Sequence, residues 1–126
     1  MFDIRLEDGR IASAEDPFVW YHPGNRTFYA VIKDFSGRIT GSDPGLAILE
    51  SPDGISWVKP VNSFFMRKEL ILQEGGKIKV NRLERPQLLV DRKGNPLVMY
   101  TACSLVDINS RTDGASFNIH IPLESR

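Results

Sequence analysis

The stretch EDPFVW at residues 15–20 returns in altered form as ERPQLL at residues 84–89. In both, a glutamate stands two positions before a proline, and an apolar run with the composition of a β-strand follows. A shift of 69 positions (84 minus 15) aligns the two stretches without a gap and also aligns FYAV at 28–31 with LVMY at 97–100. The sequence therefore predicts two structural units of the same kind.

Short apolar segments between turn residues predict an all-β chain without a helix. Glycine, proline and asparagine turns separate these segments and are of hairpin length or slightly longer, which favours antiparallel pairing of neighbours. About nine strands are expected, at residues 18–21, 27–35, 45–51, 55–60, 68–73, 77–83, 86–91, 95–104 and 116–123.

The repeat divides the chain into two units within one expected domain, residues 1–126. Repeated units of several short strands are the signature of β-propeller blades, whose usual period is roughly 40 to 50 residues. The first blade is predicted at 15–60 and a second, partial blade at 84–126. Residues 61–83, with the turn EGG at their centre, explain the longer spacing as an inserted hairpin.

The segment SPDGISW at residues 51–57 predicts a tight turn within the first unit. An aspartate can accept hydrogen bonds from the backbone that follows it, and a glycine allows a positive φ. Trp57 is expected to fold back and cover this turn. The segment resembles a hairpin of carbohydrate-active propellers and is one residue shorter than the sialidase Asp-box.

Composition excludes several classes of function. Sixteen basic and sixteen acidic residues cancel, so the basic excess of a nucleic-acid-binding domain is missing. The single cysteine, Cys103, excludes an internal disulfide and is expected as a small buried side chain. Two histidines offer no metal-ligand spacing, and we expect neither a metal nor another cofactor. No signal segment or membrane span is expected, and the sequence leaves the cellular compartment open.

Three segments, at residues 14–35, 45–60 and 80–102, resemble blades of the five-bladed β-propeller glycoside hydrolases. This superfamily includes arabinanases, xylosidases, fructosidases and neoagarooligosaccharide hydrolases. In it, an acid at the start of each innermost strand, followed closely by a proline, points to a pocket on the propeller axis. The resemblance implies an incomplete propeller of about two to three four-stranded antiparallel blades that acts on or binds a poly- or oligosaccharide.

The resemblance also implies roles for particular residues. Glycoside hydrolysis uses one carboxyl group that protonates the leaving oxygen and a second that activates water or attacks the sugar. Glu84 is the expected proton donor, and Asp16 is the expected orienting carboxylate. The expected substrate-binding side chains are Glu15, Trp20, Arg82 and Arg85. Local structure gives alternative interpretations: Asp16 as a turn residue, Glu84 in an ion pair, and Trp20 in the core.

The chain is too short to close a propeller, because closure takes at least four blades. We therefore expect a homo-oligomer or further blades of a longer chain, and a monomer without a complete catalytic site. Three hypotheses follow: a hydrolase-like fragment that other blades complete, a non-catalytic carbohydrate-binding or interaction module, and a β-sandwich binding domain. The identity of the sugar and the stereochemical outcome are open.

Overall fold

A computed structural model describes residues 2–5, 9–34, 37–41, 45–105 and 116–123. Across these ranges the chain forms ten β-strands and no helix, and every strand pairing is antiparallel, which confirms the all-β prediction. The strands are β1 (Phe2–Arg5), β2 (Ile11–His22), β3 (Thr27–Asp34), β4 (Gly45–Ser51), β5 (Phe64–Arg67), β6 (Glu69–Ile71), β7 (Lys77–Lys79), β8 (Arg82–Val90), β9 (Pro96–Ser104) and β10 (Ser116–Pro122).

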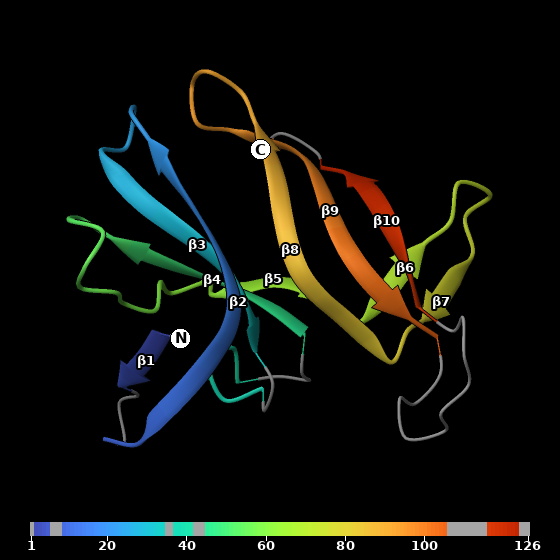
Figure 1. Cartoon of the computed structure of the whole chain (residues 1–126), viewed down its shortest axis with the longest axis horizontal. Helices are drawn as coiled ribbons and strands as arrows, with labels where there is room; N and C mark the ends of the chain where they lie inside the picture. Colours follow the sequence, from blue (N-terminus) through green and yellow to red (C-terminus); the bar gives the residue numbers. More distant parts are fainter. Residues whose placement is uncertain (1, 6–8, 35–36, 42–44, 106–115, 124–126) are drawn as a thin grey trace.

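The first five strands form one sheet in their chain order, β1-β2-β3-β4-β5 (Figure 1). Alternation along β3 and β4 sends side chains to both faces of this sheet, and both faces are buried there. One face carries a cluster of buried residues, namely Ile4, Ala30, Ile32, Ile39, Ala47 and Leu49, with Trp57 packed against it. Trp57 thus contacts the core beside its turn.

The prediction of a strand at residues 55–60 is wrong. Residues 52–56 bend, and only Val58 makes an isolated bridge, to Glu50. The reason is the Asp53 carboxylate, whose Oδ1 accepts hydrogen bonds from the backbone N–H groups of Ile55 and Ser56 at 2.8 Å each. Because these donors serve the turn, they are not available to a strand. The next strand of the sheet is instead β5, which pairs with β4.

The remaining strands form two smaller sheets. β8, β9 and β10 make a three-stranded sheet in the order β10-β9-β8, and β6 pairs with β7 around the Glu74–Gly76 turn. β5 lies within residues 61–83, which the sequence suggested as an inserted hairpin, yet it belongs to the first sheet. The separate hairpin is confined to β6 and β7.

The repeated Glu-x-Pro stretch forms the same irregularity in both sheets. The pairing register shifts between Glu15 and Phe18 in β2 and between Glu84 and Gln87 in β8, as at a β-bulge. The residue between glutamate and proline has a positive φ in each case, 53° at Asp16 and 51° at Arg85. Since proline has no N–H to donate, its place in the bulge removes no ladder hydrogen bond.

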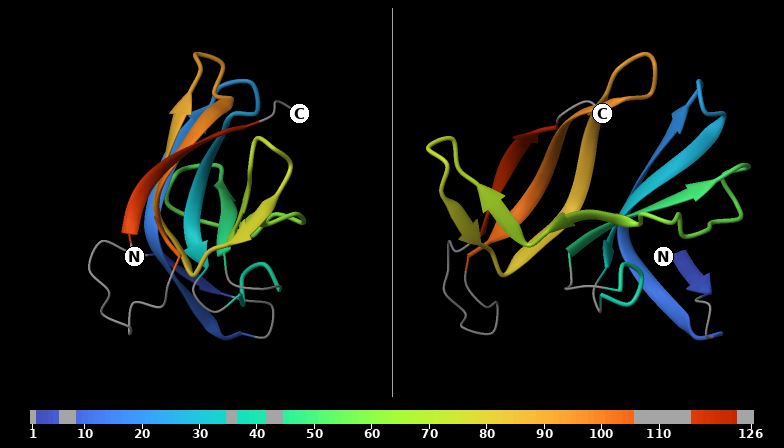
Figure 2. Two further views of the ribbon diagram at one scale, coloured as in Figure 1. Left: turned by 90° about the vertical axis from the view of Figure 1, so that its right-hand side faces the viewer. Right: turned by 180° about the vertical axis from the view of Figure 1, so that it is seen from behind.

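The two larger sheets pack against each other through β2 of the first and β8 of the second. Figure 1 shows β2 and β8 side by side and running in the same direction, and the reverse view in Figure 2 shows the sheets diverging from this line. A second cluster of buried residues draws on both sheets. Its members are Trp20, Val31, Leu46, Val80, Leu83, Leu88, Met99 and Cys103. Cys103 is therefore a small core side chain, as expected.

The turn between β8 and β9 is fixed to the end of β2. The indole Nε1 of Trp20 donates a hydrogen bond of 3.0 Å to the carbonyl oxygen of Gly94. His22 Nδ1 accepts from the backbone N–H of Asn25, so its Nε2 carries the proton and donates to Asn95 Oδ1 at 3.2 Å. Gly94 lies so close to β2 that a Cβ atom on it would stand 2.7 Å from His22 Cα.

We predict that Gly94→Ala lowers the free energy of unfolding by about 2 kcal/mol or more, because a left-handed conformation and a backbone clash add together. Gly94 has a φ of +88°. Gly75→Ala is the matched control, since Gly75 has a φ of +92° and a Cβ added there would meet no atom of the described residues within 4 Å. The control should lose only about 1–2 kcal/mol. Urea unfolding followed by tryptophan fluorescence measures both, and equal losses would contradict the close approach.

Candidate functional site

The two repeated glutamates meet at one lysine. Lys33 of β3 lies 2.6 Å from Glu84 Oε1 and 3.9 Å from Glu15 Oε2, measured from its Nζ. Arg82 Nη1 also donates to Glu84 Oε1, at 3.1 Å. Glu15 stands opposite Lys33 in the β2–β3 register, whereas Glu84 reaches it from the other sheet. The leading acids of the two units therefore point toward a common position.

These contacts set the charge of Glu84. The hydrogen bond from Lys33 is the largest influence and lowers the pKa of the Glu84 carboxyl below its usual value. Burial opposes this, while the charges of Lys33 and Arg82 and the hydrogen bond from Arg82 lower the pKa further. A general acid in glycoside hydrolysis needs a raised pKa so that it carries a proton near neutral pH. The surroundings of Glu84 favour the opposite state near neutral pH, the charged carboxylate.

Asp16 and Arg85 occupy the corresponding bulge positions, with different surroundings. The Asp16 side chain is partly buried, and Arg85 is exposed. A bulge turns its central side chain away from the regular alternation of the strand. In β8 this directs Arg85 to the margin of a surface depression.

Of the other predicted substrate-binding residues, Trp20 and Arg82 have structural contacts. Trp20 is buried, its ring stacks on Tyr29 with 5.4 Å between centroids, and its N–H is bound to Gly94. It therefore offers no open face to a sugar. Arg82 is bound to Glu84. Glu15 is half exposed beside Lys33.

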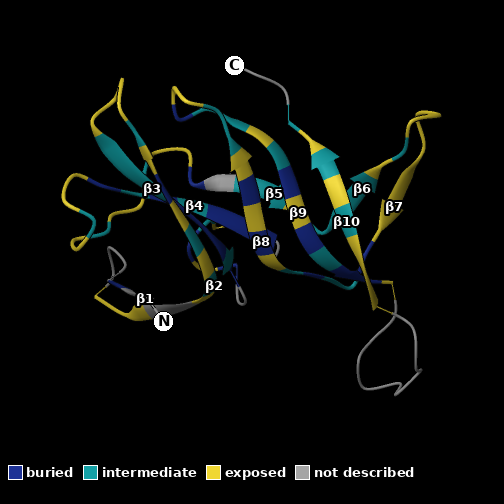
Figure 3. Cartoon of the chain, turned by 45° about the horizontal axis from the view of Figure 1, so that its top comes forward, coloured by how far each residue is buried: buried dark blue, intermediate teal, exposed yellow. Residues whose placement is uncertain are grey.

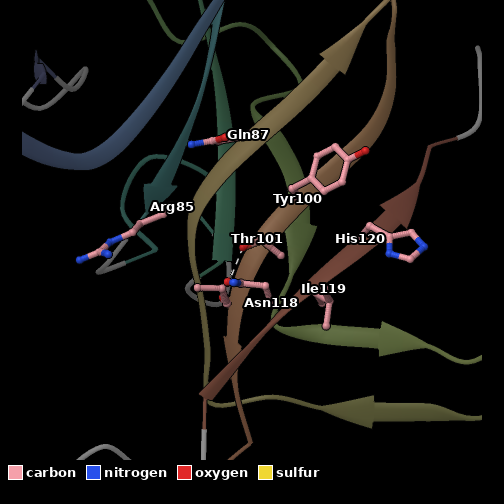
Figure 4. Close-up of a pocket in the computed structure, with 8 residues that line it drawn as sticks. Arg85, Gln87, Tyr100, Thr101, Asn118, Ile119 and His120 are labelled. Carbon is pink, nitrogen blue, oxygen red and sulfur yellow. Dashed lines mark hydrogen bonds between the residues drawn. The ribbon is translucent and has the colours of Figure 1, made fainter.

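The depression lies on the β8–β10 sheet and has a volume of about 540 Å³. Figure 4 shows the side chains that line it. In the strand registers, Tyr100 stands between Gln87 and His120, and Ala102 stands between Glu84 and Asn118. The small side chain of Ala102 leaves a hollow beside the Tyr100 ring. We call this surface the open face; its lining comprises Arg85, Gln87, Tyr100, Thr101, Ala102, Asn118, Ile119 and His120.

The open face combines an exposed ring with unpaired polar groups. Tyr100 is 48% exposed, and exposed positions recur along β8 and β10 in Figure 3. Within the described ranges, Arg85, Gln87, Asn118 and His120 have no side-chain hydrogen bond or ion pair. Of these four residues, the sequence indicated only Arg85 as a binding residue. The only sequence signal for this surface was that its residues occupy alternate positions in three predicted strands. The pairing of those strands, which the sequence does not give, was needed to show that the residues lie side by side.

No triad of histidine, cysteine or acidic side chains suited to a metal ion occurs among the described residues. The same residues include no helix with the length and hydropathy to cross a membrane. No family model, curated protein or solved structure matches this chain. The candidate site thus depends on geometry alone.

We predict that Glu84→Gln reduces stability at neutral pH by about 1–2 kcal/mol, because it removes a charged hydrogen bond to Lys33. The folded-state pKa of Glu84 is lowered, so its contribution is present above the unfolded value near 4.5 and is lost as pH falls through the folded value. Below about pH 5, the variant should therefore lose less further stability than the unaltered chain.

Glu15→Gln is the matched control, since the Glu15 side chain is 49% exposed and its Oε2 lies 3.9 Å from Lys33 Nζ. It should change stability by less than about 0.5 kcal/mol. Some acid dependence will remain in both variants, because backbone hydrogen bonds from Ser56 and Asn95 lower the pKa values of Asp53 and Asp91. Urea unfolding between pH 3 and pH 7 measures the effect. Parallel pH profiles for Glu84→Gln and the unaltered chain would contradict the assignment.

Proposed function

We propose that this chain binds saccharides on the open face of β8, β9 and β10 and does not hydrolyse them. The observation that carries this proposal is the Tyr100 ring, exposed in the middle strand and flanked in register by Gln87 and His120. A sugar ring has an apolar C–H face that packs on an aromatic ring and hydroxyl groups at its rim that need hydrogen-bonding partners. Side chains with free donors and acceptors surround Tyr100 in that manner.

The ion pairs of Glu84 favour binding over hydrolysis. A carboxylate with Lys33 at 2.6 Å and Arg82 at 3.1 Å is held in the charged state. It is thus poorly suited to donate a proton to a leaving oxygen at neutral pH. We infer that Glu84 joins the two sheets and supports Arg85, the next residue, at the margin of the open face.

For the architecture, we propose two blade-like units of an incomplete propeller. Each larger sheet is a meander in chain order, and in each the Glu-x-Pro bulge lies in the strand that leads into a hairpin, β2 in one sheet and β8 in the other. β2 and β8 lie side by side, as the innermost strands of adjacent blades do. A β-sandwich would also bury two sheets against each other, but it commonly connects its strands in Greek-key order.

Binding and turnover are tested together. Isothermal titration calorimetry with a panel of neutral and uronic-acid oligosaccharides measures binding, and aryl-glycosides report hydrolysis. We expect saturable binding with at least one saccharide class and no release of the aryl group. Hydrolysis that Glu84→Gln abolishes would overturn the non-catalytic assignment, and absence of binding to the whole panel would overturn the proposal.

We predict that Tyr100→Ala weakens saccharide binding about tenfold or more, because it removes the stacking surface. Tyr21→Ala is the matched control, since Tyr21 is 45% exposed but lies on the first sheet. Its affinity should stay within about twofold of the unaltered chain. Titration with the tightest saccharide of the panel gives both values. Equal losses in the two variants would place binding elsewhere.

A further inference from the structure

The outer edge of β10 has no partner strand within the described residues. Its counterpart in the first sheet is β4, which follows the same bulged strand and hairpin and is also seven residues long. β4 is covered on that side by β5. Figure 1 shows β10 at the border of its sheet, with β9 on one side. The second sheet is therefore one strand short of the four-stranded core of the first.

This edge lacks the usual protection against pairing. Exposed edge strands are commonly blocked by charged side chains, by a proline within the strand or by a bulge. β10, SFNIHIP, contains no lysine, arginine or acid, and its proline is the last residue. Its register with β9 is unbroken from Ser116 to Pro122. It is a regular strand whose backbone groups along one side have no partner among the described residues.

The register identifies which backbone groups point outward. Leu123 donates its N–H to the carbonyl of Leu97 at 2.9 Å, just beyond the paired strands. Antiparallel strands alternate between residues that bond the neighbour and residues that bond away from it. Counting back from Leu123, the backbone groups of Ser116, Asn118 and His120 point away from β9.

The outward pattern is complementary to itself. An antiparallel pairing centred on Asn118 places Ser116 opposite the partner's His120 and Asn118 opposite the partner's Asn118. Each of these pairs can exchange two backbone hydrogen bonds. Phe117 then lies across from the partner's Ile119, so that an exposed aromatic ring gains an apolar neighbour. No like charges oppose each other in this register.

We propose that two copies of this chain pair β10 with β10 in antiparallel orientation about a two-fold axis at Asn118. The two three-stranded sheets then form one six-stranded sheet. Because the axis is perpendicular to the sheet, both open faces lie on the same side. This proposal is independent of saccharide binding, because the pairing depends only on the outer edge of β10. Where saccharide binding holds, the partner's Asn118 and the partner's His120 extend each depression across the axis.

Solution mass tests the pairing. Sedimentation velocity over roughly 1 µM to 500 µM should show a reversible monomer–dimer equilibrium, because a contact limited to one strand is in the weak, transient class. Asn118→Pro removes an outward N–H without removing a bond to β9, and should weaken the dimer about tenfold or more. Asn118→Ala, which keeps the N–H, is the matched control and should dimerise within about threefold of the unaltered chain.

A disulfide test identifies the register and does not depend on affinity. In a Cys103→Ala background, Asn118→Cys places two thiols on facing residues whose Cα atoms are about 5.5 Å apart, within disulfide range. His120→Cys in the same background faces the partner's Ser116, and its two thiols lie too far apart to join. Mild oxidation should therefore give covalent dimers for Asn118→Cys and not for His120→Cys.

Two results would overturn the proposal. One is a monomeric mass over the whole concentration range, and the other is equal cross-linking of the two cysteine variants. Circular dichroism of each variant establishes that it retains the β spectrum of the unaltered chain. Saccharide titration separates this proposal from the proposed function. A loss of dimer in Asn118→Pro with saccharide binding retained at reduced affinity supports both, whereas an unaltered chain that dimerises but binds no saccharide supports only the edge pairing.

Discussion

The packing of β8 and β9 against β2 and β3 is the constraint on which the rest of the structure depends. Apolar side chains from both sheets fill this junction, and a polar contact between the sheets lies at each end of it. At one end Lys33 binds Glu84, and at the other Trp20 donates to Gly94. Because both contacts are directional, they fix the position of the second sheet along the first, which apolar packing alone specifies less strictly.

The repeated Glu-x-Pro stretch has a structural explanation that applies to both sheets. The glutamate is the last regularly paired residue, the central residue takes a positive φ, and the proline follows where no N–H is required. The bulge directs the two glutamates toward Lys33 from different sheets. The position that Lys33 holds in β3 is taken in β9 by Ala102, which faces Glu84 in register. One backbone pattern thus supports a charged contact in the first sheet and a hollow beside Tyr100 in the second.

Glu84 shows that an acid at the same position in a strand can serve two different roles, depending on its neighbours. An acid that leads an inner strand is suited to catalysis when its neighbours raise its pKa, and to a structural ion pair when they lower it. Lys33 and Arg82 produce the second outcome. The proposed binding site therefore does not use the acids and lies instead on the open face, where Arg85, which the sequence had assigned to the substrate site, lines the depression.

The sequence by itself determined the all-β class, most strand positions and the turn at Asp53, because alternation, glycine and proline act over a few neighbouring residues. It also determined that residues 15–20 and 84–89 form equivalent structures. Only the tertiary structure decided that Glu84 meets Lys33, 51 positions away, and that Trp20 is buried. It likewise decided which face of each sheet is covered and that Gln87, Tyr100 and His120 form one row. Such contacts depend on how sheets pack, and the charge or exposure of a side chain follows from neighbours that local sequence does not specify.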